Sequence, residues 1–177
     1  MDDDAVLDVA VRNMLARDEI RQLPYRYAAA LEGSDVEAMV ELFVPHARFG
    51  DHGTGPDGIR RLMAQSLENT VFVVILVANH LIELDDARHA TGQVWAQCFA
   101  QTTAGFVEQL IRYDDRYEKH SGVWRFTRRR HRLYYGVHRQ PSPLTQSAAE
   151  WPHRQIGVGD LPLAEPGFLH WWEDARP

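Results

Sequence analysis

The chain has 177 residues, 45% of them hydrophobic and 25% charged, which suits one globular domain with its own core and excludes a disordered chain. The formal net charge of −6 excludes nucleic-acid binding as a main role, because that role needs a basic surface. Cys98 is the single cysteine, so an internal disulfide and a thiolate zinc cluster are also excluded.

The sequence carries no signal that directs a chain to a membrane. The first four residues are acidic and lack the basic flank and apolar stretch of a signal peptide. The longest apolar run, residues 71–78, is far shorter than the roughly 20 residues that span a bilayer. A lone cysteine suits a reducing compartment, so these features together predict a cytoplasmic protein with no membrane partner.

Helical periodicity marks the first part of the chain. Apolar residues recur at spacings of three and four between residues 7 and 31, which predicts a long helix with one apolar face. Pro24 lies inside this segment and removes one backbone hydrogen bond, so we expect a kink or a break between two helical pieces there. Gly33 is expected to end the helix.

Two further helices are expected before the composition changes. Ser34 and Glu37 have the spacing of a capping box, which predicts a second helix that ends at Pro45. Residues 47–52 are expected to form a short strand. Pro56 suits the first turn of a third helix that continues to residue 67.

Four β-rich segments follow, separated by short turns. Parallel neighbours would need crossover connections of a dozen or more residues, so the short turns predict an antiparallel meander. The segments cover residues 71–84, 90–101, 106–118 and 123–135.

Beyond Gly136, prolines interrupt any regular element, yet large apolar side chains are frequent. We therefore expect a domain over residues 1–136 and a C-terminal arm over residues 137–177 that packs on the domain or on a partner subunit. The side chains that argue against a free linker are Trp151, Phe168, Trp171 and Trp172.

Three stretches carry a resemblance to a known family: residues 19–43 (EIRQL…YA…E…D…LF), 78–92 (AN…I…DD…ATG) and 113–125 (Y…D…YE…GVWR). Their order and spacing resemble the SnoaL-like family of the nuclear-transport-factor-two-like superfamily, which includes polyketide cyclases, scytalone dehydratase, bile-acid dehydratase and ring-hydroxylating dioxygenase small subunits. The resemblance covers residues 15–135. It implies a cone-shaped α+β barrel in which three N-terminal helices pack on a curved antiparallel sheet around one pocket for a small, mostly apolar molecule.

The resemblance also implies two catalytic positions on the first helix. Glu32 falls where the family's dehydratases and dehydrochlorinases carry a carboxylate, and a carboxylate beside an apolar cavity can exchange protons near neutrality. The alternative is a solvated residue at a helix end. Tyr27 falls where a tyrosine hydroxyl can polarise a substrate carbonyl, although an aromatic ring on a buried stripe can also be simply core.

The histidine that completes the family's catalytic pair is missing. It stands four residues before the asparagine matched by Asn79, and Ile75 occupies that place here. Three alternatives follow: another histidine takes over its role, the protein uses a different reaction mechanism, or the protein catalyses no reaction. By strand alternation Asn79 should share a face with Ile75, whereas His80 should point the other way.

Other candidates for the pocket come from the loops and the strands. Asp51 resembles a pocket-lining position of scytalone dehydratase, and His52 follows it, although such pairs also occur by chance. Residues 128–132 (RRRHR) form an arginine run. Pairing across the turns predicts that Arg130 faces the pocket and His131 faces away, whereas one β-bulge in this run would exchange them. The same run can instead pair with acidic residues of the neighbouring strand. The same pairing predicts two rows of cross-strand neighbours on the face toward the pocket: Cys98, Ile111 and Arg130 in one, and Ala96, Tyr113 and Arg128 in the other. The further residues expected on this face are Val94, Ala100, Trp124 and Phe126.

These residues lead to one main hypothesis and one alternative. No histidine pair has the helical spacing of a metal site and no glycine loop suits phosphate, so a reaction without metal or cofactor is expected. The main hypothesis is a lyase or isomerase that abstracts a proton from a polycyclic, steroid-like or polyketide-like substrate. Glu32 would act as base, Tyr27 as hydrogen-bond donor to the enolate, and His131 or Arg130 as a second electrostatic partner.

The alternative is a non-catalytic small-molecule-binding or structural subunit that kept the fold and lost the catalytic pair. Assembly is expected in either case. Three helices can cover only the concave face of the sheet, so the outer face should be buried in a homodimer or larger homo-oligomer.

Overall fold

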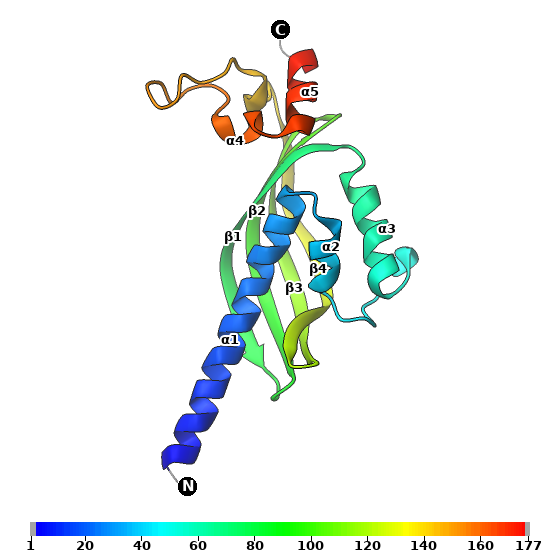
Figure 1. Ribbon diagram of the computed structural model, residues 1–177, viewed down its shortest axis with the longest axis vertical. Coiled ribbons are helices and arrows are strands. Elements are labelled where there is room, and N and C mark those ends of the chain that lie inside the picture. The colour runs from blue at the N-terminus through cyan, green and yellow to red at the C-terminus, as the bar shows by residue number, and fades with distance from the viewer. Residues whose placement is uncertain (1–2, 176–177) are drawn as a thin grey trace.

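A curved four-stranded antiparallel sheet with helices on its concave side forms the body of the protein in the computed structural model, which describes residues 3–175 (Figure 1). The strands pair in chain order, so the expected meander and the α+β class are confirmed. The elements are α1 (Asp3–Glu32), α2 (Val36–Glu41), η1 (Gly50–His52), α3 (Gly55–Leu67), β1 (Thr70–Leu84), β2 (His89–Thr102), β3 (Gly105–His120), β4 (Val123–Arg139), η2 (Pro143–Thr145), α4 (Asp160–Leu163) and α5 (Pro166–Ala175).

The first helix, α1, runs unbroken through Pro24, so the expected break into two pieces is wrong. Pro24 lies on the buried face, beside Ile20 and Leu23, which are 0% and 3% exposed. A proline inside a helix costs about 3 kcal/mol, and burial of two large aliphatic side chains offsets that cost. None of the described helices is long and apolar enough to cross a membrane.

The corner between α1 and α2 is built differently from the expected capping box. Ser34 has a φ of +51°, the left-handed conformation that ends α1. Asp35 is the N-cap of α2 instead, and its carboxylate accepts a hydrogen bond of 2.9 Å from the amide of Ala38. Glu37 accepts hydrogen bonds of 2.7 and 2.8 Å from Arg60 of α3, and so ties the two helices together.

The strand expected at residues 47–52 does not form. The segment holds one isolated bridge, between Arg48 and Thr54, and then the short helix η1. Gly50 and Gly53 have φ values of +58° and +96°, which extended strands do not allow, so the backbone turns back on itself. The third helix begins as expected, with proline in its first turn.

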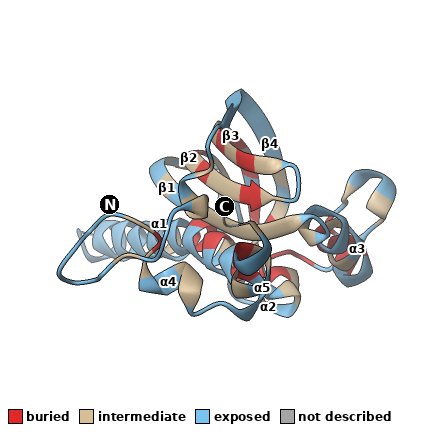
Figure 2. Cartoon of the chain, turned by 90° about the horizontal axis from the view of Figure 1, so that it is seen from above, coloured by how far each residue is buried: buried red, intermediate tan, exposed pale blue. Residues whose placement is uncertain are grey.

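The sheet has two unlike faces. Seen from above, α1 and α2 lie on one side of the curved strands, and buried positions mark that side (Figure 2). The core there joins Ile20 of α1, Met39 of α2 and Ile59 of α3 to Tyr117 and Phe126 of the sheet. The outer face carries no helix of the described chain, so side chains on it meet solvent or a partner.

The expected strand register is wrong by two residues between β2 and β3 and by three residues between β3 and β4. Cys98 pairs with Gln109, and Ile111 pairs with Ala96 and Leu133. A loop of two residues between Thr102 and Gly105 sets this pairing, since each hairpin register follows from the length of its loop.

The arm after the sheet is ordered and contacts β1. Strand β4 itself continues past Gly136 to Arg139. Phe168 of α5 is fully buried, and its ring centroid lies 5.9 Å from that of Phe72. Residues 1–2 and 176–177, which include the last two residues of the expected arm, lie outside the described part of the chain.

Candidate functional site

An apolar patch on the concave face, called the apolar floor below, consists of Ile75, Val94, Ala96, Cys98 and Ile111. These residues share one face because their strands are paired at Ile75–Cys98 and Ala96–Ile111. Helix α1 lies over this floor, with Ala28 packed against it. These side chains are between 0% and 8% exposed, so the floor is buried apolar core beneath α1, and the polar groups beside it supply the candidate chemistry.

A buried cation stands beside the apolar floor. Strand β4 has one extra residue, Thr127, opposite the junction of Arg116 and Tyr117 in β3. This β-bulge turns Arg129 inward, so its side chain is only 4% exposed. The guanidinium carbon lies over three aromatic rings, 3.8 Å from the centroid of Tyr113, 4.3 Å from that of Tyr27 and 4.8 Å from that of Phe126.

A hydrogen-bonded chain leads away from this cation. Arg129 Nε lies 3.4 Å from Oδ1 of Asp115, whose side chain is 0% exposed. Tyr117 donates its hydroxyl proton to Asp115 Oδ2 at 3.0 Å. His80 Nε2 lies 3.1 Å from the same hydroxyl oxygen. Because Tyr117 donates its only hydroxyl proton to Asp115, His80 Nε2 is the donor, and its Nδ1 keeps a lone pair.

His80 joins this chain through a second β-bulge. The register of β1 and β2 shifts between Val77 and His80, so Ala78 and Asn79 stand together opposite Trp95. The extra residue reverses the faces, and the expectation that His80 points away from the pocket side is therefore wrong.

Several polar atoms of this cluster have no hydrogen-bond partner within residues 3–175. They are Arg129 Nε and Nη1, Asp115 Oδ1 and His80 Nδ1. Arg129 Nε and Asp115 Oδ1 are close enough to attract each other but do not form a hydrogen bond. Buried polar groups without partners cost free energy, so a concentration of them indicates a place where a ligand or water supplies the missing partners.

Burial and charge together set the protonation states of the cluster. Burial raises the pKa of Asp115 to about 6, although Arg129 and the Tyr117 hydroxyl act in the opposite direction. Burial, with Arg129 second, lowers the pKa of His80 to about 4, so this ring is neutral at pH 7. Burial also raises the pKa values of Tyr27 and Tyr113, so both keep their hydroxyl protons. The tyrosines and Arg129 are therefore donors near neutrality.

Glu32 lies at the other end of the apolar floor. It is the last residue of α1 and is exposed, and its Oε1 accepts a hydrogen bond of 3.3 Å from the backbone amide of Ile75. The carboxylate therefore reaches the strand position where the resemblance expects a histidine. Ile75 is 7% exposed and fills that place with an aliphatic side chain.

The comparisons with known proteins identify the family. The family model described as a SnoaL-like domain matches residues 12–130, about two thirds of the chain. The chain belongs to the SnoaL-like family. No curated protein matches it.

Solved structures share the SnoaL-like architecture. A candidate scytalone dehydratase from Novosphingobium aromaticivorans has a TM-score of 0.65 at 18% identity, over 74% of this chain and 92% of that one. A hexachlorocyclohexane dehydrochlorinase, LinA type 2, has a TM-score of 0.69 at 16% identity, over 75% and 94%. An NTF2-like protein with a cystatin-like fold, also from Novosphingobium aromaticivorans, has a TM-score of 0.62 at 23% identity, over 76% and 92%.

The bulge in β4 of this SnoaL-like protein also decides which faces of the sheet carry His131 and Arg130, the two candidate site residues of the last strand. His131 pairs with Tyr113 on the concave side, with 5.5 Å between their ring centroids. Partial burial, and Arg129 second, lower the pKa of His131. Arg130 pairs instead with Asp114 and lines the outer face, away from the apolar floor. The sequence alone left this exchange open, and the extra residue settles it.

The remaining predicted residues are spread over the fold. Tyr113 and Cys98 lie on the concave face, and burial raises the pKa of Cys98 to about 11, so it is a thiol at neutral pH. Asp51 is exposed in η1, and the carbonyl of His52 accepts a 2.8 Å hydrogen bond from Arg61. Asn79 is exposed within the β1 bulge. Among the described residues no group of three His, Cys, Asp or Glu side chains could hold a metal ion.

Sequence reasoning missed most of the polar residues that dominate this SnoaL-like interior. Asp115 and Tyr117 alternate with the predicted Tyr113 along β3, a signal that was present in the sequence. In the sequence, Asp115 stands out only as one of the acidic residues of the neighbouring strand, with Glu108 and Asp114, that can pair with the arginines of residues 128–132. Arg129 and His80 carried no comparable signal, because only the two bulges turn them inward.

Proposed function

We propose that this SnoaL-like protein is a cofactor-independent lyase or isomerase that removes a proton beside a carbonyl of a small polycyclic, steroid-like or polyketide-like substrate. The observation that carries the proposal is Arg129, a buried cation beside an apolar floor whose Nη1 has no hydrogen-bond partner in the described part of the chain. A fixed guanidinium in surroundings poor in water stabilises the negative charge that develops on the carbonyl oxygen.

Each group would have one task in this reaction. Glu32 takes the proton from the carbon next to the carbonyl, and the electron pair of that C–H bond moves to the carbonyl oxygen. Arg129 and the hydroxyl of Tyr27 donate hydrogen bonds to the resulting enolate. A lyase then expels hydroxide, which leaves as water after protonation, whereas an isomerase returns the proton to another carbon. Asp115 fixes the guanidinium, and His131 is a neutral polar neighbour of the site.

The names of two structural neighbours support the lyase alternative. A dehydratase removes water and a dehydrochlorinase removes hydrogen chloride, and both eliminations take a proton from carbon. Identities of 18% and 16% indicate a shared fold but not a shared reaction. The extension of this chemistry to the present chain is therefore part of the proposal.

A second candidate is a non-catalytic small-molecule-binding or structural subunit. Ile75 favours it, because a buried aliphatic side chain stands where the resemblance expects the histidine partner of Glu32. Such a protein would hold its ligand on the apolar floor and leave its protons in place.

Exchange of carbon-bound protons separates the two candidates without knowledge of the substrate. With β-tetralone, a bicyclic ketone, in heavy water, proton NMR follows the loss of the signals beside the carbonyl. The wild type should speed this exchange, and Arg129→Met should lower the enzymatic rate by about 10²-fold. Arg130→Met is the matched control on the outer face and should keep the wild-type rate.

Two further outcomes complete the test. Arg129→Met leaves Asp115 buried without its cation, so the double variant Arg129→Met with Asp115→Asn separates lost chemistry from lost stability. A wild-type protein that binds the ketone, seen as a raised Tm, yet does not speed exchange would be the second candidate.

A further inference from the structure

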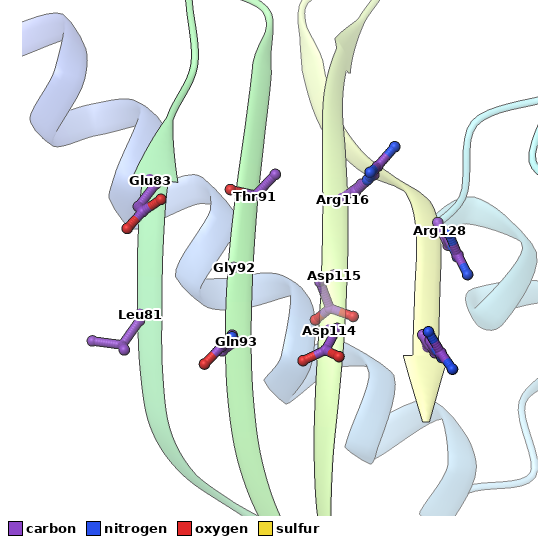
Figure 3. A pocket seen from close by; sticks show the side chains of 10 residues that line it. Leu81, Glu83, Thr91, Gly92, Gln93, Asp114, Asp115, Arg116 and Arg128 are labelled. Atoms are coloured by element: carbon purple, nitrogen blue, oxygen red, sulfur yellow. The ribbon is translucent and has the colours of Figure 1, made fainter. Parts of the chain in front are cut away.

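A hollow of about 410 Å³ lies on the outer face of the sheet, opposite the concave side (Figure 3). All four strands contribute to it, and α1 lies behind the strands in the view of Figure 3. The residues that the argument needs are Glu83 of β1, Thr91 and Gln93 of β2, Arg116 of β3, and Arg128 and Arg130 of β4.

Three arginines meet at this hollow. Arg116 and Arg128 are direct cross-strand partners, and Arg130 follows two residues later on the same face of β4. The β4 bulge produces this arrangement, since Arg129 between them is turned inward. Like charges directly opposite each other destabilise a sheet, so the structure bears an electrostatic cost at this point.

Glu83, Asp114 and Asp115 also line the hollow, and two of these three carboxylates, Asp114 and Asp115, are already engaged by arginines outside the trio. Asp114 lies 2.9 Å from Arg112 and 3.3 Å from Arg132. Asp115 faces the concave side and pairs with Arg129. Within residues 3–175 no carboxylate forms an ion pair with Arg116, Arg128 or Arg130. Among the described residues, three arginines therefore face one unpaired carboxylate, Glu83, so a protein with a net charge of −6 keeps a local excess of positive charge in this hollow.

We propose that this hollow binds a small organic diphosphate. Guanidinium groups match phosphate oxygens with paired hydrogen bonds, and Arg116 and Arg128 are close enough to hold one phosphoryl group between them. Arg130 is their diagonal neighbour, about 7–8 Å along the face, which suits a second phosphoryl group. Thr91 and Gln93 add hydroxyl and amide donors.

The size and charge of the hollow set the class of ligand. Its volume lies within the range of roughly 300–1,000 Å³ that small-molecule sites occupy, so it leaves room for an organic group beside the phosphates. Glu83 on the β1 side would repel a polyanion that continued across the sheet, which favours a compact ligand over a nucleic-acid strand. The site is independent of the proposed reaction, because the two lie on opposite faces of the sheet.

Calorimetric titration of the full chain with inorganic pyrophosphate, at low ionic strength, tests the proposal. We expect saturable binding at one site per chain, tighter than that of orthophosphate and weakened by salt. Arg116→Gln and Arg128→Gln should each raise Kd by about tenfold or more, since each removes hydrogen bonds between charged groups. Glu83→Gln should lower Kd. All three side chains lie on the outer face, so Tm should change little.

The control is Arg154→Gln, which changes the net charge equally but lies in the arm at the other end of the sheet. Its Kd should equal that of the wild type. The proposal is overturned if pyrophosphate does not bind saturably, if Arg154→Gln weakens binding as much as Arg128→Gln, or if duplex DNA binds more tightly than pyrophosphate and loses its affinity in the same variants.

Discussion

Arg129 packs its guanidinium against three aromatic rings, and its charge reaches the titratable groups around it. It acts to lower the pKa values of both histidines of the concave face, His80 and His131. It acts in the same direction on Asp115, where burial is the larger effect. Burial, with Arg129 as the second cause, therefore keeps the histidines neutral, and Arg129 opposes burial enough to leave the Asp115 carboxylate mostly ionised near pH 7, a pattern that suits proton transfer and anion stabilisation.

Glu32→Gln tests the base. The amide keeps the shape and the hydrogen bond from Ile75 but cannot accept a proton. Exchange of β-tetralone protons should fall by about 10²-fold or more, while ketone affinity and Tm change little. His131→Ala should be measured in the same assay. If His131 is the catalytic partner of Glu32, this variant shows a similar loss of exchange rate, and the double variant loses little more. Exchange at the wild-type rate in Glu32→Gln would rule this mechanism out.

His80 should make the protein sensitive to acid. Its pKa of about 4 in the folded state lies below the value of about 6.5 in the unfolded chain. Between these pH values the unfolded chain binds a proton at this residue and the folded protein does not, so stability is lost as the pH falls through this window. Allowing for partial exposure, the loss amounts to about 1–2 kcal/mol.

His80→Gln should therefore flatten the fall in Tm between pH 7 and pH 4, measured by thermal denaturation at each pH. His170→Gln, an exposed histidine of α5, is the matched control and should keep the wild-type slope. Parallel curves for wild type and His80→Gln would contradict the assignment of His80 as a half-buried neutral ring.

At the scale of elements, Gly92 of β2 makes the hydrogen-bonded chain possible. A methyl group at this position would lie 2.8 Å from the carbonyl oxygen of Leu81 and 3.1 Å from the hydroxyl of Tyr117. Gly92→Ala should cost about 1–3 kcal/mol, because Tyr117 and strand β1 must both shift. Chemical denaturation measures the loss. Gly159→Ala, where nothing lies within 4 Å of the added methyl, is the control, and an equal loss there would show the effect to be unspecific.

The elements differ in how far sequence determines them. Periodicity and short turns were sufficient for α1, α3 and the four strands, because burial on one face repeats over many residues. The site depends on two single-residue irregularities, at Asn79 and Thr127. Neither residue type is distinctive for a bulge. The position of a bulge depends on how the neighbouring strands and α1 pack together. The alternation of apolar and polar residues in the sequence does not report that packing.

At the scale of the whole molecule, the outer face is the main surface left to explain. Its half nearest the arm exposes Tyr134, Tyr135 and Val137, of which Tyr134 is 73% exposed. An aromatic patch on a sheet without covering helices is typical of an interface between subunits. The cationic hollow occupies the other half of the same face, so a partner on the aromatic half would leave it open.

We predict a homodimer or larger homo-oligomer, measurable by light scattering at micromolar concentration. Tyr134→Glu should shift the protein toward the monomer while its circular dichroism stays unchanged, because the side chain is exposed within one subunit. Leu161→Glu, at an exposed apolar residue of α4, is the control. A wild-type protein that scatters as a monomer would count decisively against the prediction.

The bulge at Thr127 has a consequence for comparison among relatives. A homologue whose last strand is regular reaches the same inward position with one residue fewer after the aromatic residue that matches Phe126. An ungapped alignment would then place its inward side chain opposite Arg128, which belongs to the outer face. An ungapped alignment would therefore match residues of the concave face in one protein with residues of the outer face in the other, although their positions in space are the same. An alignment that allows one gap in this strand pairs the equivalent side chains.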